Sequence, residues 1–138
     1  MDERDTRLRV FVVEDSSVLV KRIIEWFEAD SRVHVIGTAA TATVAIAEIQ
    51  RLSPDVVIVD VALAAGTGFD VLRVLQRLPD ATRPVSVMLT NHSSPPYRNA
   101  ATQLGARHFF DKTGDFMRMV ETVRGLAGEH GHRNGSEG

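Results

Sequence analysis

Short apolar runs alternate with segments of helical periodicity along most of the chain. The apolar runs, bounded by turn-forming residues, predict β-strands at 8–13, 33–37, 56–59, 85–89 and 106–110. After each run, apolar residues recur at helical spacing and predict helices near 18–27, 44–52, 69–78, 95–104 and 116–126. Strand and helix therefore alternate five times, which is the pattern of an α/β protein.

The third apolar run, residues 56–59, follows Pro54 and ends at Asp60. Four β-branched apolar residues without a polar interruption are typical of a central parallel strand that is buried on both faces. In an open α/β sheet, ligands bind just beyond the carboxyl ends of the strands. Asp60 and the loop 61–68 therefore lie where this kind of sheet carries its chemistry.

The connections between the expected strands are long enough for right-handed crossovers between parallel strands. We predict a (βα)5 doubly wound parallel sheet in the order 2-1-3-4-5. It forms one domain over residues 7–127, and we expect the leader 1–6 and the tail 128–138 to be disordered, since the tail has no apolar residue beyond Gly128.

Capping residues mark the ends of several expected helices. Gly105 suits the position after the end of the fourth helix. Side chains that accept backbone hydrogen bonds precede three helices, and the expected N-caps are Ser16 or Ser17, Ser93 or Ser94, and Thr113 or Asp115.

Composition narrows the class of protein. The chain has 138 residues, 43% of them hydrophobic, and a net charge of −2, so we expect neither a nucleic-acid partner nor a membrane surface. It has no cysteine, which excludes disulfides and thiolate chemistry. No apolar run is long enough to span a membrane, and the charged N-terminus is unlike a signal peptide, so we expect a cytoplasmic protein.

Polar residues collect where the expected strands end: Glu14 and Asp15, Asp60, Thr90, and Lys112. In the order 2-1-3-4-5 these residues share one rim of the sheet. Carboxylates a few ångströms apart repel one another, and a hard divalent cation such as Mg²⁺ relieves that repulsion. A metal, a lysine and a hydroxyl beside a carboxylate are the parts that phosphoryl transfer to that carboxylate requires. Only Lys21 and Lys112 among the 16 basic residues are lysine, which adds weight to Lys112 because arginine does not replace a compact point charge.

With these residues in this order, the chain resembles the receiver domain of two-component response regulators, whose fold is flavodoxin-like. The resemblance covers residues 7–127 and rests on the pair Glu14-Asp15, Asp60 after Asp-Val-Val-Ile-Val, Thr90 ending Val-Met-Leu-Thr, and Lys112 in Phe-Phe-Asp-Lys. It implies that Asp60 is the phosphoacceptor.

The resemblance also implies roles for the neighbours of Asp60. Mg²⁺ or Mn²⁺ would be bound by Asp15, by Asp60, by Glu14 through a water, and by the backbone carbonyl of Ala62. Thr90 and Lys112 would contact the phosphoryl group, and Phe109 would be the switch aromatic that responds to Thr90.

Three departures from the family pattern stand out. Glu14 replaces the commoner aspartate, and Ala64 stands where proline is frequent. Thr113 follows Lys112 where the family usually has a proline in a cis bond. A non-proline cis peptide costs about 2.5–4 kcal/mol, so this bond is either trans or held under strain.

The function that the resemblance implies is signal transduction. Asp60 would accept a phosphoryl group from a sensor histidine kinase or a histidine phosphotransfer protein. The surface formed by the fourth helix, the fifth strand and the fifth helix would then bind a downstream protein, with the chain a monomer or a phosphorylation-dependent dimer. The chain would catalyse at most its own phosphorylation and autodephosphorylation, and we expect a stand-alone receiver because no output domain follows residue 127.

Other interpretations stay open at this point. The rival function is a degenerate receiver that binds partners without phosphorylation. Either Phe109 or Phe110 faces the core, His92 lies either on the rim of the pocket or in an ordinary loop, and His130 and His132 are more simply tail residues than metal ligands. An FMN site is disfavoured because Glu14-Asp15 would repel the phosphate. A haloacid-dehalogenase-type phosphatase would need an aspartate in place of Ala62.

Overall fold

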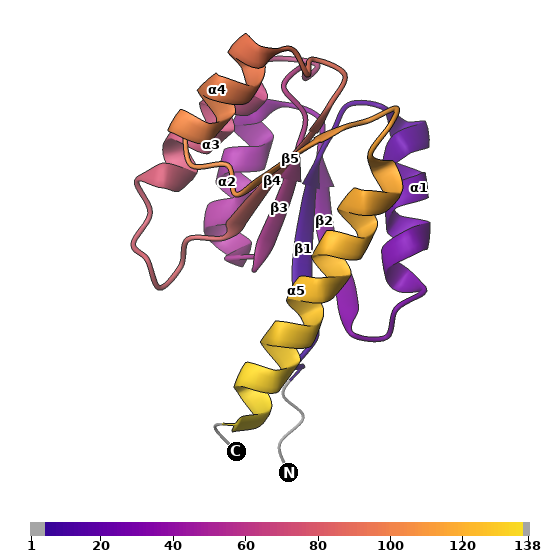
Figure 1. The fold of residues 1–138 in the computed structure, drawn as a ribbon. Helices are drawn as coiled ribbons and strands as arrows, with labels where there is room; N and C mark the ends of the chain where they lie inside the picture. The colour runs from indigo at the N-terminus through magenta and orange to yellow at the C-terminus, as the bar shows by residue number, and fades with distance from the viewer. Residues whose placement is uncertain (1–4, 137–138) are drawn as a thin grey trace.

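The protein was studied as a computed structural model, which describes residues 5–136 and, for residues 131–136, the backbone alone. Five strands and five helices alternate along it (Figure 1). In chain order they are β1 (Leu8–Val13), α1 (Ser17–Glu28), β2 (Val33–Ala39), α2 (Ala42–Leu52), β3 (Val56–Val59), α3 (Gly68–Gln76), β4 (Val85–Thr90), α4 (Pro95–Gln103), β5 (His108–Asp111) and α5 (Phe116–Ser136).

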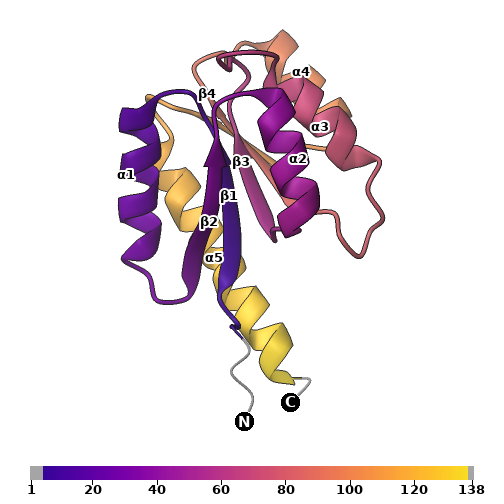
Figure 2. The ribbon, with the colours of Figure 1, turned by 180° about the vertical axis from the view of Figure 1, so that it is seen from behind.

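The strands form one parallel sheet in the order β2-β1-β3-β4-β5, which confirms the predicted topology. Helices α1 and α5 cover one face of the sheet, and α2, α3 and α4 cover the other (Figures 1 and 2). All strand carboxyl ends therefore point to one end of the molecule, at the top of Figure 1. The start of β1 and the last turns of α5 lie at the opposite end (Figure 1).

Two apolar cores lie on either side of the sheet, and alternation along the strands assigns each side chain to one of them. Val12 and Ile58 pack toward α1 and α5. Val13 and Val57 pack toward α2 and α3. All four residues of β3 are buried, which is why its sequence is apolar without interruption.

The helix ends follow local chemistry in most places. Ser16 caps α1, because its side chain accepts a hydrogen bond from the amide of Leu19. Gly105 has a φ of +93°, a left-handed conformation that glycine adopts easily, and it follows the end of α4 as predicted. At the start of α4 the prediction holds for position only: Ser94 occupies the N-cap position, but its side chain makes no capping hydrogen bond, and the hydroxyl of Ser93 donates to Asp111.

The end of α5 corrects the expectation of a disordered tail from residue 128, because the helix continues to Ser136. Ala127 is still buried against the core, and the imidazole of His130 lies 3.9 Å from the carboxylate of Asp55. Helix α5 therefore still contacts the rest of the protein beyond Leu126, its last large apolar residue. Residues 1–4 of the expected leader and residues 137–138 of the tail lie outside the described residues. Over the described part of the chain, none of the helices combines the length and apolarity that crossing a membrane would require.

Candidate functional site

Four strand ends meet at one rim and bring the predicted residues together. Glu14 follows β1, Asp60 follows β3, Thr90 ends β4, and Lys112 follows β5. The ammonium of Lys112 lies 2.7 Å from Asp60 Oδ2 and 2.9 Å from Glu14 Oε1. Lys112 therefore bridges two carboxylates that come from different strands, as the sequence predicted for a shared rim.

Three carboxylates of this rim could hold a divalent cation. Glu14, Asp15 and Asp60 each offer an oxygen, and these atoms lie within 4.8 Å of one another. Glu14 and Asp60 are buried, with 5% and 4% of their surface exposed, whereas Asp15 is exposed to solvent. Oxygen donors from carboxylates, open to water on one side, suit a hard cation such as Mg²⁺.

Burial and hydrogen bonding shift the pKa of Glu14, and that of Lys112, in opposite directions. Burial raises the pKa of Glu14, although hydrogen bonds from the Ser16 amide and from Lys112 partly offset it. For Lys112, burial alone would lower the pKa, but hydrogen bonds to Asp60 and Glu14 outweigh it and raise the pKa. The lysine therefore stays charged at neutral pH, between the two carboxylates.

Glu14, which stands where the family more often has aspartate, uses both of its carboxylate oxygens within the protein. Its Oε1 contacts Lys112, and its Oε2 accepts a hydrogen bond of 2.9 Å from the Ser16 amide at the start of α1. Both oxygens are thus engaged within the protein, and the longer side chain contributes to positioning Lys112. Asp15 next to it is the more accessible carboxylate of the pair.

Asp60 and α3 come into very close contact at Gly68. The amide of Gly68 donates to the carbonyl of Val61, and a Cβ on Gly68 would lie 2.1 Å from the Asp60 carbonyl oxygen. Thr67 and Asp70 then form a capping box that begins α3. A residue without a side chain is therefore required for the loop to return to the strand end.

Thr90 is completely buried and is tied to two neighbours. Its hydroxyl accepts a hydrogen bond of 3.1 Å from the His92 amide, and its carbonyl accepts one of 3.1 Å from the Lys112 amide. The hydroxyl thus sits at the rim, where it is bound to the loop that leads into α4. The predicted contacts of Thr90 with a phosphoryl group, and of the Ala62 carbonyl with a metal, stay predictions.

The two phenylalanines of β5 face opposite cores. Phe110 is buried with α1 and α5, whereas Phe109 is half-buried on the α3–α4 side. The guanidinium of Arg98 in α4 lies 4.7 Å from the centre of the Phe109 ring. The alternative that the sequence left open is thereby decided, and Phe109 lies next to the helix that it is predicted to influence.

His92 lies exposed in the loop after β4, beside Thr90, and its ring packs on Tyr97 of α4. The ring centres of His92 and Tyr97 are 5.1 Å apart, and that of Phe69 in α3 lies 6.4 Å from Tyr97. These rings connect the loop after β4 to α4 and α3. The sequence suggested a role for His92 at the rim but gave no sign of Tyr97.

The peptide bond between Lys112 and Thr113 is trans, and a side chain supports the turn that a proline usually makes. Asp111 Oδ1 accepts hydrogen bonds from the amides of Thr113 (2.8 Å) and Gly114 (3.2 Å). Asp111 Oδ2 accepts one of 2.6 Å from the hydroxyl of Ser93. Sequence reasoning missed this pair, because Ser93 was interpreted only as a helix cap.

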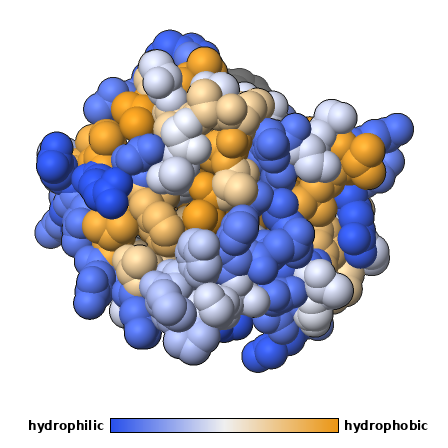
Figure 3. All heavy atoms as spheres, turned by 90° about the horizontal axis from the view of Figure 1, so that it is seen from above, coloured by the Kyte–Doolittle hydropathy of each residue, from blue (hydrophilic) through white to orange (hydrophobic). Residues whose placement is uncertain are grey.

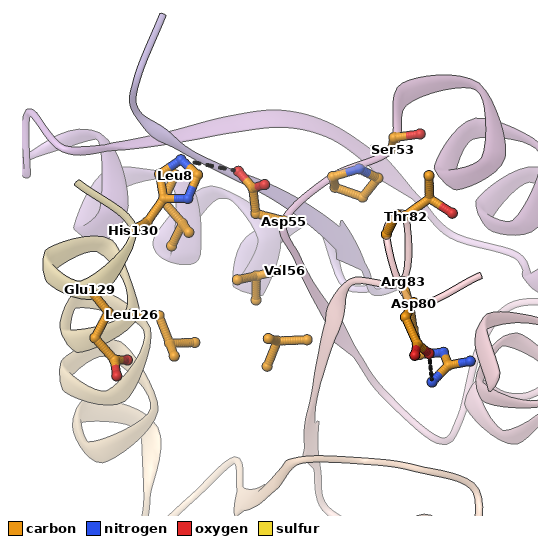
Figure 4. A pocket seen from close by; sticks show the side chains of 13 residues that line it. Leu8, Ser53, Asp55, Val56, Asp80, Thr82, Arg83, Leu126, Glu129 and His130 are labelled. Carbon is orange, nitrogen blue, oxygen red and sulfur yellow. Dashed lines mark ion pairs between the residues drawn. The ribbon is translucent and has the colours of Figure 1, made fainter. Parts of the chain in front are cut away.

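The described residues also line cavities beside the rim and away from it. One, of about 550 Å³, borders it between α1 and the start of α2 and includes Asp15, Lys21, Ile24 and Val44. Seen from the end where the strands finish, the surface mixes apolar and hydrophilic side chains (Figure 3). Another, of about 310 Å³, lies at the opposite end of the sheet, where ion pairs join His130 to Asp55 and Arg83 to Asp80 (Figure 4).

The chain is similar to known proteins over most of its length. The model of the response regulator receiver domain matches residues 10–124. Protein-glutamate methylesterase/protein-glutamine glutaminase 2 of Xanthomonas oryzae pv. oryzae is 34% identical over 129 residues, which are 90% of this chain and 33% of that protein. The DNA-binding transcriptional activator DevR/DosR of Mycobacterium tuberculosis is 29% identical, over 85% of this chain and 53% of its own length.

Among solved structures, the signal receiver domain of a putative Luxo repressor protein from Vibrio parahaemolyticus has a TM-score of 0.80. It is 25% identical, and the match covers 96% of this chain and 98% of that one. The chain spans about one third of the methylesterase and about half of the activator.

Proposed function

Because the chain belongs to the family of response regulator receiver domains, we propose that Asp60 accepts a phosphoryl group and thereby switches a protein-interaction surface. The observation that carries this proposal is the bridge of Lys112 between Asp60 and Glu14, at 2.7 and 2.9 Å. A carboxylate that is paired with a lysine beside two further acids has both a nucleophile and a counter-ion in place.

The donor is a phosphohistidine of a sensor histidine kinase or a histidine phosphotransfer protein. A carboxylate oxygen of Asp60 forms a bond to phosphorus while the phosphorus–nitrogen bond of the donor breaks, and the electron pair of that bond stays on the imidazole. Lys112 moves its ion pair from the carboxylate to a phosphoryl oxygen. Glu14 keeps the second contact of Lys112 and so limits how far the lysine moves.

The residues that would hold Mg²⁺ or Mn²⁺ are Asp15 and Asp60, with Glu14 through a water and the carbonyl of Ala62. The cation supplies positive charge that neutralises the incoming phosphoryl group. The exposure of Asp15 supports this assignment, because Mg²⁺ in proteins usually keeps several of its water ligands.

The output of the switch is a surface made by α4, β5 and α5, which binds a downstream protein target. Phe109 on β5 and Arg98 on α4 already contact each other there, which supports a coupled response of the two elements. We place the protein in the cytoplasm, as a monomer or a phosphorylation-dependent dimer, with neither nucleic acid nor a membrane as a direct partner. The alternative function is a receiver that binds partners without phosphorylation.

Mass spectrometry after incubation with an acyl phosphate and Mg²⁺ tests the proposal. Wild type should gain the mass of one phosphoryl group, and Asp60→Asn should gain none. Asp80→Asn is the matched control, since the side chain of Asp80 is 94% exposed and lies at the other end of the sheet. Equal labelling of wild type and Asp60→Asn would refute the assignment, and absence of labelling in wild type would favour the phosphorylation-independent module.

A further inference from the structure

Ser93 connects three parts of the switch through short contacts. Its hydroxyl donates to Asp111 Oδ2 at 2.6 Å, and its carbonyl accepts a hydrogen bond of 2.9 Å from Arg98 Nε. Asp111 is the residue immediately before Lys112. Ser93 thus joins the loop after β4, the loop that carries Lys112, and helix α4.

The bond between Ser93 and Asp111 is stronger than an ordinary surface contact. It is charge-assisted and short, and both residues are half-buried. The hydrogen bond from Ser93 is the largest of the causes that keep the pKa of Asp111 below its usual value, followed by the Thr113 and Gly114 amides. The carboxylate is therefore ionised at neutral pH, when the switch operates.

The same loop is attached to Thr90. The His92 amide donates to the Thr90 hydroxyl, and His92 is adjacent to Ser93 in the chain. A Thr90 hydroxyl that turns toward a phosphoryl group on Asp60 either loses the His92 amide or draws the loop with it. The second movement pulls Ser93 away from Asp111.

Phe109 is linked to Ser93 through Arg98. Arg98 donates to the Ser93 carbonyl, and its guanidinium lies 4.7 Å from the centre of the Phe109 ring. A cation over an aromatic face is attracted to it. Displacement of Ser93 therefore removes one of the contacts that orient Arg98 over Phe109.

We propose that Ser93 is a positioning residue, whose bond to Asp111 stabilises the resting arrangement of Thr90 and Phe109 and is broken on activation. The inference rests on the proposed function and goes beyond it, because the link between Thr90 and Phe109 then runs through a side chain of the loop. A ligand shifts a two-state equilibrium only by its difference in affinity for the two states. Loss of a contact that belongs to the resting state must therefore increase the apparent affinity for any ligand of the active state.

In the test, wild type, Ser93→Ala, Ser93→Thr and Ser94→Ala are each titrated with beryllofluoride and Mg²⁺ as the phosphoryl mimic. The amide chemical shifts of Thr90 and Phe109 report the binding. Ser93→Ala should bind the mimic about fivefold more tightly than wild type, at the lower end of typical coupling between sites. Ser93→Thr keeps the hydroxyl and should stay close to wild type. Ser94→Ala is the matched control, since Ser94 is adjacent and makes no capping hydrogen bond, and it should also match wild type.

The outcomes separate the two proposals. If wild type does not bind beryllofluoride, the proposed function fails. If wild type binds it but Ser93→Ala has the affinity of Ser94→Ala, or a lower one, the role of Ser93 is refuted. General damage to the fold would lower the affinity, so an increase that Ser93→Thr does not share is specific to the hydroxyl.

Arg98→Met gives a second, independent measurement. It removes the contact with the Ser93 carbonyl and the cation over Phe109 together. Affinity for the mimic should rise, and combining it with Ser93→Ala should give less than the product of the two single effects, because Arg98 and Ser93 contact each other directly and each substitution weakens the contribution of the other. Fully independent effects would show that the contact between Arg98 and Ser93 does not couple the two residues.

Discussion

Replacement of Lys112 by methionine removes the cation that bridges Asp60 and Glu14 while keeping a side chain of similar length. Glu14 and Asp60, which are 5% and 4% exposed, would then lie side by side without their counter-ion. Like charges in a buried place repel each other and are poorly solvated. We expect Lys112→Met to destabilise the protein at neutral pH, independently of any effect on phosphorylation.

The size of the effect follows from the two contacts of Lys112. At 2.7 and 2.9 Å, each Coulomb attraction is about 6 kcal/mol gross at an effective dielectric constant of about 20. Most of this is offset by the cost of burying the charges, and breaking a buried pair costs about 3–5 kcal/mol net. Because 16% of the Lys112 side chain is exposed, we expect Lys112→Met to lower the free energy of unfolding by about 3 kcal/mol. That is a large share of the free energy of unfolding of a typical protein, about 5–15 kcal/mol.

The loss should depend on pH in a defined direction. Burial already raises the pKa of Glu14 above its ordinary value of 4.5, and removal of Lys112 raises that pKa further. A carboxyl whose pKa is raised by folding contributes stability that is fully present below the unfolded pKa and is lost as pH rises through the folded pKa. The gap between wild type and Lys112→Met should therefore be small at about pH 4.5 and widen toward pH 7.

Urea unfolding followed by circular dichroism at a series of pH values measures this gap. Lys21→Met is the control, because Lys21 is the other lysine of the chain and lies exposed on α1. It should change the free energy of unfolding by less than about 0.5 kcal/mol at every pH. A gap for Lys112→Met that is equally small, or that does not change with pH, would contradict the proposed balance of charges.

Two further predictions concern the loop and the metal. Gly68→Ala should destabilise the protein by about 1–3 kcal/mol, since its Cβ would meet the Asp60 carbonyl oxygen at 2.1 Å. The control Gly125→Ala, in open space on α5, should stabilise it by about 0.5–1 kcal/mol. Equal effects of the two substitutions in urea unfolding would contradict the close contact at Gly68. Millimolar Mg²⁺ should raise the melting temperature of wild type by mass action and leave that of Asp15→Asn unchanged, and an equal rise in both proteins would rule out Asp15 as a ligand.

Sequence reasoning succeeded where the relevant interactions follow the period of a strand. The uninterrupted apolar run of residues 56–59 predicted a strand that is buried on both faces, and β3 is such a strand. The rule that parallel strands end at one rim brought Asp60, Glu14 and Lys112 together without any knowledge of distances. These features are set by local pattern and topology, which a single sequence contains.

The features that sequence reasoning missed depend on contacts between distant residues. Ser93 and Asp111 are separated by 18 positions and meet because β4 and β5 are neighbours. A serine before a helix is equally well suited to capping, so nothing local favours the longer-range bond. The contact of His130 in α5 with Asp55 likewise depends on another part of the fold.

The start of β1 and the last turns of α5 lie together at the end of the molecule remote from the strand carboxyl ends (Figure 1). An affinity tag or surface anchor attached there would leave the rim around Asp60 facing the solution. Immobilised protein would then present this rim in one uniform orientation to any candidate partner in flow, with no linker across it. The same geometry suits a pair of fluorophores, one at the anchored end and one on α4, as an optical sensor of the switch.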